Sequence, residues 1–462
     1  MRHFDVVVIG TGPAGHHAAI QAAKLGKRVA AIERRRVVGG GGLHTGTIPS
    51  KTLREAVLYL TGFRQRGLYG ISYRVKSSIT PQDLIFRVEH VLKREIAVLE
   101  DQFARNGVEL IYGLASFIGP HTLCIRNGEE EEVEAEMFVL APGSIPAHSP
   151  KIPVDGRYIF DTECILNLTS IPKRLIVVGA GVIGVEYASI FSALGTEVTL
   201  VDLRHDILEF VDREILEALS YHMRGRGVVF RLGEAVEEVV REGEEVVART
   251  TTHKTIVGDC LLYTVGRLGA TADLALDAVG LEPDPRGRLA VDENYRTAIP
   301  YIYAVGDVVG FPALASVSME QGRVAIRYAF GLRATKSQGL LPYGIYTIPE
   351  ISMVGRTEEE LTKQGVPYEF GLARYSETAR GLIVGDTTGK LKLLVHAENR
   401  HILGVHIIGE GATELVHIGQ LAIALGGTLD FLVNNVFNYP TLAECYKVAA
   451  LDAFNKLSPR RR

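Results

Sequence analysis

Near the start of the chain stands Asp5-Val-Val-Val-Ile-Gly-Thr-Gly-Pro-Ala-Gly15, a β-branched run that leads directly into a glycine-rich loop. A helical pattern follows as far as Gly26, and a second apolar run ends at Glu33. In such a unit, the glycines permit a tight turn and a close approach of the backbone to a pyrophosphate at the helix N-terminus. An acid at the end of the second strand accepts hydrogen bonds from a ribose. The stretch therefore predicts a dinucleotide-binding βαβ unit.

A second unit follows the same plan. Residues 175–178 lead into Gly179-Ala-Gly-Val-Ile-Gly184, a helical pattern ends at Gly195, and a further strand ends at Asp202. The acid stands 18 residues after the third glycine in both units. One G-x-G-x-x-G loop is a weak signal, but two loops with strand, helix and acid in place predict two bound dinucleotides. The fold class predicted is α/β, with two Rossmann-like dinucleotide-binding domains.

The two units need not bind the same nucleotide. Glu33 suits a ribose diol, whereas Asp202 suits a 2′-hydroxyl. Arg204 suits a 2′-phosphate, and His205 stands beside it. An acid with a neighbouring cation favours acceptance of both NAD and NADP. The alternative is that Arg204 is an ordinary arginine facing solvent.

Composition excludes several classes of protein. The 462 residues are enough for about three domains. Hydrophobic residues make up 47% and charged residues 23% of the chain, which excludes disordered and fibrous classes. A net charge of −4 offers no basic excess for binding nucleic acid. No apolar run approaches the ~18 residues of a membrane span and no signal peptide is recognised, so we expect a cytoplasmic protein with no membrane partner.

The number and spacing of the cysteines also restrict the kinds of site that the chain can form. The cysteines, of which there are four, are Cys124, Cys164, Cys260 and Cys445. They lie far apart and form no C-x-x-C pair. This spacing predicts neither a disulfide scaffold nor a metal site.

Outside the two glycine loops, the hydrophobic pattern changes along the chain. The predicted elements are a long amphipathic helix over 85–103, a hairpin over 122–133, strands over 391–396 and 402–408, and helices from Thr413 and Thr441. The region past residue 340 is therefore a mixed α+β tail without a nucleotide loop. Such a tail favours a role in packing or assembly.

The stretch Val38-Gly-Gly-Gly-Gly-Leu-His-Thr-Gly-Thr-Ile-Pro-Ser-Lys51 resembles the signature of the flavoprotein disulfide reductases, and the resemblance covers essentially the whole chain. Further matching motifs lie at 137–143, 263–267, 303–307, 347–350 and 403–409. The resemblance implies bound FAD, NAD(P) as substrate, and a C-terminal α+β dimerisation domain that makes a homodimer or a larger homo-oligomer. The implied divisions are 1–150 and 271–340 for the FAD-binding domain, 151–270 for the NAD(P)-binding domain, and 341–462 for the dimerisation domain.

The resemblance also assigns site residues. Lys51 is expected beside the flavin N5 atom, where its charge favours the reduced flavin, with Glu186 paired to it next to the nicotinamide. Thr47 is expected near the flavin, and Asp307 on its ribityl chain. The implied FAD ligands are Gly10, Gly12, Gly15, Glu33, Lys51, Gly143 and Asp307, and the implied NAD(P) ligands are Gly179, Gly181, Gly184, Asp202, Arg204 and Gly266. Two alternatives stay open: Lys51 and Glu186 form only a structural ion pair, and Thr47 is only the N-cap of a helix.

The redox disulfide of that family falls at the positions of Gly42 and Thr47. Neither residue can form a thiolate or a mixed disulfide, so disulfide exchange at this site is excluded. The histidine of the family's C-terminal acid–base pair is replaced by Tyr439, whose phenol is a poor proton shuttle at neutral pH. Thiol and base are lost together, which indicates one altered chemistry. Tyr439 and Glu444 are then expected to have a structural role, closing the former disulfide pocket against the partner subunit.

Within that family, Gly46-Thr-Ile-Pro-Ser-Lys51 and Phe437-Asn-Tyr-Pro-Thr441 resemble the soluble pyridine nucleotide transhydrogenases, as do residues 346–351. The chain departs from their pattern at Gly42 and Ala270, where a cysteine and an asparagine are usual. The implied function is FAD-dependent hydride transfer between NADPH and NAD⁺. The two nucleotides would use one nicotinamide site in turn, a ping-pong reaction.

Two other functions stay open at this point. An NAD(P)H oxidase or quinone reductase would share every motif and pass the electrons to oxygen or a quinone. A non-catalytic flavoprotein, acting as a sensor or an assembly subunit, belongs to a different class. The joint presence of Lys51, Glu186 and Asp307 argues against that second alternative.

Overall fold

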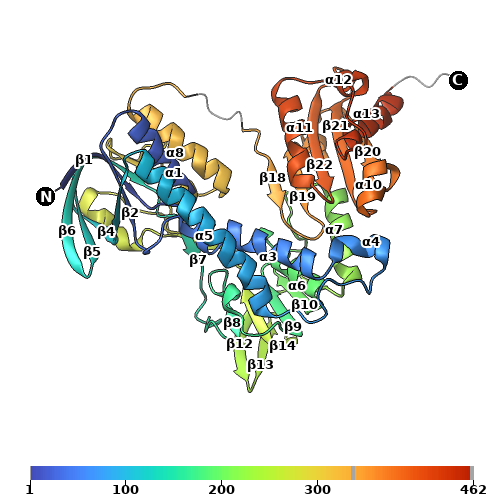
Figure 1. Cartoon of the computed structure of the whole chain (residues 1–462), viewed down its shortest axis with the longest axis horizontal. Helices are drawn as coiled ribbons and strands as arrows, with labels where there is room; N and C mark the ends of the chain where they lie inside the picture. The colour runs from blue at the N-terminus through green and yellow to red at the C-terminus, as the bar shows by residue number, and fades with distance from the viewer. Residues whose placement is uncertain (1, 335–338, 458–462) are drawn as a thin grey trace.

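The computed structural model of the chain describes residues 2–334 and 339–457 (Figure 1). Its N-terminal unit is built on a sheet with the strand order β3-β2-β1-β6-β5-β4, and β17 lies beside β6. β1 pairs in parallel with β2 and β6, and β17 also pairs in parallel with β6. The strands are β1 (Arg2–Ile9), β2 (Val29–Glu33), β3 (Glu109–Tyr112), β4 (Leu114–Gly119), β5 (Thr122–Asn127), β6 (Glu129–Leu140) and β17 (Ile302–Ala304). The chain thus leaves this sheet after β6 and returns to it with β17.

Helices cover one face of this first sheet (Figure 1). They are α1 (Pro13–Lys24), α5 (Pro81–Arg105) and α8 (Ala315–Ala329). α5 confirms the amphipathic helix predicted over 85–103, and it begins earlier because Thr80 and Asp83 form a capping box around Pro81. β5 and β6 form the predicted antiparallel hairpin. The opposite face of the sheet packs against apolar side chains of residues 274–289.

The second unit repeats the parallel plan, with the strand order β11-β10-β9-β15-β8. These strands are β8 (Ile159–Phe160), β9 (Arg174–Val178), β10 (Glu197–Asp202), β11 (Val229–Leu232) and β15 (Cys260–Tyr263). α6 (Val182–Leu194) and α7 (Arg213–Gly225) accompany the sheet, and Gly195 ends α6 with the left-handed φ of 96° that favours glycine. An antiparallel meander, β12 (Val236–Glu242), β13 (Glu245–Thr250) and β14 (Thr255–Gly258), projects at the bottom of Figure 1.

The C-terminal unit is an antiparallel sheet with the order β18-β19-β22-β21-β20. Its strands are β18 (Tyr343–Ile345), β19 (Ile351–Gly355), β20 (Tyr368–Arg374), β21 (Lys390–His396) and β22 (Ile402–Ile408), and its helices are α9 (Glu358–Gln364), α10 (Ala379–Val384), α11 (Ala412–Ala424), α12 (Leu429–Asn434) and α13 (Glu444–Leu457). The strands predicted over 391–396 and 402–408 are confirmed. The helix predicted from Thr441 is wrong in its start, because the Thr441 hydroxyl binds the Asn438 carbonyl in a turn and the helix begins at Glu444.

Short elements join these units. They are α2 (Gly40–His44), α3 (Thr47–Leu60), α4 (Arg66–Tyr69), β7 (Ser144–Pro146), β16 (Arg267–Gly269) and the 3₁₀ turns η1 (Phe63–Gln65), η2 (Ile165–Asn167), η3 (Ala272–Leu274), η4 (Leu276–Val279), η5 (Gly306–Val309) and η6 (Tyr375–Glu377). β7 and β16 pair with each other and tie the first unit to the second. Parallel α/β units followed by an antiparallel α+β unit confirm the predicted fold class. No helix within residues 2–334 and 339–457 combines the length and the apolar character needed to cross a membrane.

Candidate functional site

A cavity of about 1020 Å³ lies where the two parallel units and the C-terminal unit meet. Most of the residues predicted for the site line it. They are Gly10, Gly12, Glu33, Thr47, Lys51, Gly143, Gly179, Gly181, Glu186, Asp202, Arg204, Gly266 and Asp307. Gly15 and Gly184 are not among the lining residues, because each packs its helix against the strand before it.

The first glycine loop connects β1 to α1 and leaves the helix N-terminus open toward the cavity. Gly10 has a φ of 101°, and a Cβ added there would collide with the Ala141 carbonyl. A Cβ on Gly15 would collide with the Gly10 carbonyl, so the close contact of helix and strand requires glycine. Gly12 is the N-cap of α1 and faces more open space, since a Cβ added there would meet its nearest neighbour, the Gly40 Cα atom, at 3.7 Å. The loop therefore has the shape that a pyrophosphate requires.

The second loop connects β9 to α6 with the same geometry. Gly179 has a φ of 109° and lies against Thr264, while Gly184 lies against the Gly179 carbonyl. Gly181 is the N-cap of α6. The Nη2 atom of Arg204 lies 3.8 Å from the position of a Cβ at Gly181, which places a guanidinium beside this helix N-terminus.

Each predicted ribose acid is anchored to its own glycine loop. Glu33 is buried and accepts hydrogen bonds from the backbone N–H of Thr11 at 3.2 Å, from the Thr11 hydroxyl, and from the N–H of Arg35 at 3.0 Å. Asp202 accepts from the Ala180 N–H at 2.6 Å. Both acids therefore stand at the carboxyl end of a strand, where the loop itself fixes their orientation.

Asp202 and Arg204 also bind each other. Arg204 donates from Nε at 3.0 Å and from Nη2 at 2.7 Å, although its side chain is 43% exposed. Burial opposes ionisation of Asp202, but the hydrogen bonds from Arg204 and Ala180 outweigh it and lower the pKa of that carboxyl. A carboxylate and a guanidinium thus stand together at the mouth of the second loop.

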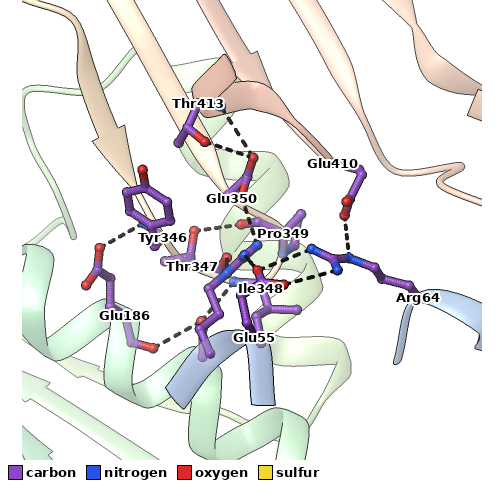
Figure 2. Close-up of polar contacts among 12 residues, drawn as sticks. Glu55, Arg64, Glu186, Tyr346, Thr347, Ile348, Pro349, Glu350, Glu410 and Thr413 are labelled. Carbon is purple, nitrogen blue, oxygen red and sulfur yellow. Dashed lines mark hydrogen bonds and ion pairs between the residues drawn. The ribbon is translucent and has the colours of Figure 1, made fainter. Parts of the chain in front are cut away.

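Lys51 on α3 and Glu186 on α6 form an ion pair in the cavity wall, with 2.7 Å between Nζ and Oε2. The Glu186 side chain is 3% exposed and that of Lys51 is 25% exposed. The second carboxylate oxygen accepts the Tyr346 N–H at 2.8 Å (Figure 2). Lys51 Nζ lies 5.0 Å from the centre of the Tyr346 ring. The alternative that Thr47 caps the helix is wrong: the N-cap of α3 is Gly46, Thr47 is the first helical residue, and no side-chain cap is made.

The two positions at which the resemblance implies a redox disulfide lie at the same cavity. Gly42, in α2, lines it together with Thr47. All cysteines of the chain lie within the described residues, and each is a free thiol. Burial raises the pKa of Cys164 to about 11 and that of Cys260 to about 12, so these thiols are poor nucleophiles. The residues that the structure describes include no group of three or more His, Cys, Asp or Glu side chains able to hold a metal ion.

The structure adds residues that the sequence reasoning missed. The Ser144 hydroxyl donates to Asp307 at 2.7 Å and accepts from Nε of Arg267 at 2.8 Å. Arg267 also donates to the Ser144 carbonyl at 2.6 Å and to the Thr162 hydroxyl at 3.2 Å. These contacts brace Asp307 and the β7–β16 pair beside the cavity. The sequence did contain a signal for these residues, because Ser144 directly follows the motif that ends at Gly143, and Arg267 follows Gly266 in the motif at 263–267.

Tyr439 and Glu444 do not line this cavity in the single chain. The Tyr439 side chain is exposed, and Oε2 of Glu444 is buried with no hydrogen-bond partner among the described residues. Ala270, the second position at which the chain departs from the resemblance, does line the cavity.

Comparisons with known proteins agree with this geometry. The family described as pyridine nucleotide-disulphide oxidoreductase matches residues 4–322, and its dimerisation domain matches residues 341–450. A curated relative from Mycobacterium bovis (strain BCG / Pasteur 1173P2), named soluble pyridine nucleotide transhydrogenase, is 52% identical over 99% of this chain and 98% of its own length. A relative of the same name from Photobacterium profundum is 44% identical over 98% of each chain.

Solved structures show the same architecture. LpdA from Mycobacterium tuberculosis superposes with a TM-score of 0.89 at 26% identity, covering 99% of this chain and 100% of that one. The HOCl-induced flavoprotein disulfide reductase RclA from Escherichia coli gives a TM-score of 0.87 at 27% identity, covering 97% and 99%. These likenesses extend through the C-terminal antiparallel unit as well as the two parallel ones.

Proposed function

The chain belongs to the pyridine nucleotide-disulphide oxidoreductase family, and on that premise we propose that it transfers hydride between NADPH and NAD⁺ through a bound FAD. One observation carries the proposal. A cavity with two dinucleotide loops and a Lys51–Glu186 pair has Gly42 and Thr47 where the family's thiols would stand. The relatives named soluble pyridine nucleotide transhydrogenases, at 44–52% identity over nearly the full length, support the same activity.

The residues present fit a flavin dinucleotide. The open N-terminus of α1 suits a pyrophosphate, and Gly10 and Gly15 permit the tight turn and the close packing of helix on strand that leave it open. Glu33 suits the adenosine ribose, and Asp307, braced by Ser144, is placed to accept from a polar chain lying along the cavity. This set favours FAD over a mononucleotide, since a mononucleotide would leave the first loop without a pyrophosphate. A bound flavin would supply the group that takes up a hydride from one nicotinamide and returns it to another.

The side chains of the cavity wall then have distinct tasks. Lys51 supplies a fixed positive charge, and Glu186 holds that ammonium group in place. Thr47 contributes a hydroxyl to the same wall at the start of α3. Gly42 and Thr47 offer no sulfur to divert the electrons, so a second nicotinamide is the expected destination.

The second loop is proposed to bind both nicotinamide nucleotides in turn. Asp202 suits the free 2′-hydroxyl of NAD, and Arg204 suits the 2′-phosphate of NADP when it turns away from Asp202. Gly179, Gly181 and Gly266 line the remainder of this site. Since the loop can hold one dinucleotide at a time, NADP⁺ must leave before NAD⁺ enters, which is the ping-pong order.

Assembly and location follow as further proposals. The match of residues 341–450 to the dimerisation domain supports a homodimer, in which Tyr439 and Glu444 approach the partner subunit. We place the flavin domain at 1–150 and 271–340, the nicotinamide domain at 151–270 and the dimerisation domain at 341–462. We also place the protein in the cytoplasm, where both substrates are present.

The proposed function is tested by an initial-rate assay with NADPH and a nicotinamide analogue of NAD⁺ whose reduced form is distinguished by its absorbance. Parallel double-reciprocal lines, with formation of one reduced analogue for each NADPH consumed, are expected of a ping-pong transfer. Oxidation of NADPH in air without the analogue, with formation of peroxide, would instead identify an oxidase. Omission of the analogue under anaerobic conditions is the control.

A further inference from the structure

Residues 346–350 form a short strap that links β18 to β19 beside Glu186 of the ion pair (Figure 2). Consecutive backbone groups of this 346–350 strap are bound by side chains. The Tyr346 N–H donates to Glu186 Oε1 at 2.8 Å. The Thr347 carbonyl accepts from Arg54 Nε at 2.9 Å, and the Ile348 N–H donates to Ser189 Oγ at 2.9 Å.

The side chains that bind the strap lie on the same two helices as the ion pair. Lys51 and Arg54 are three residues apart on α3, and Glu186 and Ser189 are three residues apart on α6. Side chains at this spacing lie on one face of a helix. Each helix therefore presents one member of the Lys51–Glu186 pair and, one turn on, one side chain that holds the strap.

Arg54 is the deepest cation of this arrangement. It is 3% exposed, and the Thr347 residue that it binds is fully buried. Its Nη2 lies 3.1 Å from Glu350 Oε2, and its Nη1 donates to Glu55 Oε1 at 2.8 Å. A buried guanidinium needs such partners, because leaving its N–H groups without them costs free energy.

Glu350 connects Arg54 to helix α11 of the C-terminal unit. Its other carboxylate oxygen faces the N–H and the hydroxyl of Thr413 on α11, each at 3.3 Å (Figure 2). Burial raises the pKa of Glu350, and the charge of Arg54 opposes that rise. Arg54 thus fixes both the middle and the end of the strap, while Arg54, Thr347 and Glu350 are not among the residues lining the cavity.

We propose that Arg54 is a positioning residue for hydride transfer. By binding the 346–350 strap, it holds the Tyr346 N–H in place, and the hydrogen bond from this N–H orients Glu186 to bind Lys51. Arg54 acts through the strap and does not line the cavity. The proposal rests on the proposed function for its kinetic consequence, but its structural consequence is measured separately.

The test uses the flavin-loaded full chain. In Arg54→Met/Glu350→Gln, both charges of the buried pair are removed, so neither is left without a partner. Arg64→Gln is the matched control, because Arg64 binds the same Glu55 carboxylate and Glu410 but lies outside the strap. Hydrogen exchange should accelerate at the Tyr346 and Ile348 amides in the double variant and stay at the wild-type rate in Arg64→Gln. Wild-type protection of both amides in the double variant would overturn the proposal.

The kinetic arm is a cycle with Glu186→Gln. The limiting rate of flavin reduction by NADPH should fall by about 10-fold or more in the double variant, since small misplacements of a reacting group cost up to ~10²-fold, while the Kd for NADPH stays within about 2-fold. In the Glu186→Gln background the same substitutions should have little further effect, because Arg54 acts through Glu186. Equal slowing in both backgrounds would overturn the proposal. If the wild-type chain reduced its flavin but failed to pass hydride to NAD⁺, the proposed function would fall, whereas both arms of this test would still decide the role of Arg54.

Discussion

Lys51 and Glu186 are 135 positions apart in the chain, yet they form an ion pair of 2.7 Å in the wall of a cavity between two nucleotide loops. If the ammonium charge assists the arrival of the hydride, Lys51→Met should slow the anaerobic reduction of the flavin by NADPH by about 100- to 1,000-fold, the range seen when one fixed electrostatic partner is removed. Stopped-flow absorbance measures this rate, and flavin content verifies that the variant is loaded. An unchanged limiting rate would leave the pair as a structural contact only.

Nucleotide choice is predicted to depend on the Asp202–Arg204 pair. Arg204→Ala should raise the KM for NADPH by about 10- to 100-fold and leave that for NADH nearly unchanged, since a charge-assisted hydrogen bond contributes about 1.5–3 kcal/mol. Steady-state kinetics with each nucleotide measure the effect. Arg213→Gln is the control, because Arg213 is an exposed arginine of α7. Equal changes for both nucleotides would contradict the assignment of Arg204 to the 2′-phosphate.

The same pair predicts a pH dependence. Because Arg204 and Ala180 lower the pKa of Asp202 in the folded chain, ionisation of this carboxyl favours folding above its ordinary pKa of 3.8, and the contribution is lost as pH falls through the lower folded value. The Tm of Asp202→Asn should therefore be lower than that of wild type at pH 7, and the difference between the two Tm values should become smaller toward pH 3. A constant difference in Tm across this range would contradict the shift.

Restoring the thiol at position 42 should be tolerated. A Cβ at Gly42 would lie 3.2 Å from Pro13 Cγ, a tight contact that a small shift relieves. Gly42→Cys should therefore lower the unfolding free energy by about 1 kcal/mol, as mild overpacking does. Since one cysteine cannot form a disulfide with Thr47, the rate of transfer from NADPH to NAD⁺ should stay within about 3-fold of wild type. Loss of transfer in a variant with full flavin content would show that position 42 takes part in the chemistry.

A buried cation connects the second unit to the C-terminal unit, and its removal is predicted to lower the stability of the chain. Lys392 on β21 is fully buried, with Nζ 3.0 Å from both carboxylate oxygens of Asp212, and it also pairs with Glu358. Lys392→Met should destabilise the chain by about 3–5 kcal/mol because it leaves the Asp212 charge buried alone, and Lys392→Met/Asp212→Asn should recover much of that loss. Urea unfolding measures both. Equal losses in the two variants would show that packing, and not the charge pair, is responsible.

Much of the fold was predictable because its signals are local. The close packing of Gly15 against the Gly10 carbonyl, and of Gly184 against the Gly179 carbonyl, joins residues five positions apart, so both strand–loop–helix units are recognisable in the sequence. The contacts of Gly10 with Ala141 and of Gly179 with Thr264 join distant segments and are seen only in the folded chain. The family motif placed Lys51 and Glu186 together. The start of α13 at Glu444 was missed, because the Thr441 hydroxyl is used by a turn that no periodicity marks.

The bracing of the site was not predictable from local pattern. Ser144 and Asp307 are 163 positions apart, and Arg54 reaches the Thr347 carbonyl across 293 positions. A serine or an arginine in a helix or loop is ordinarily solvated, and only the folded chain shows which backbone group it binds. Such contacts depend on how α3, α6 and the 346–350 strap come together in space.

The most direct test of the central claim follows the visible absorbance of the bound flavin under anaerobic conditions. NADPH should bleach it, and NAD⁺ added after removal of NADP⁺ should restore it with formation of one NADH per flavin. Flavin that stays bleached with NAD⁺ and recovers only with oxygen or a quinone would contradict hydride transfer between the two nucleotides.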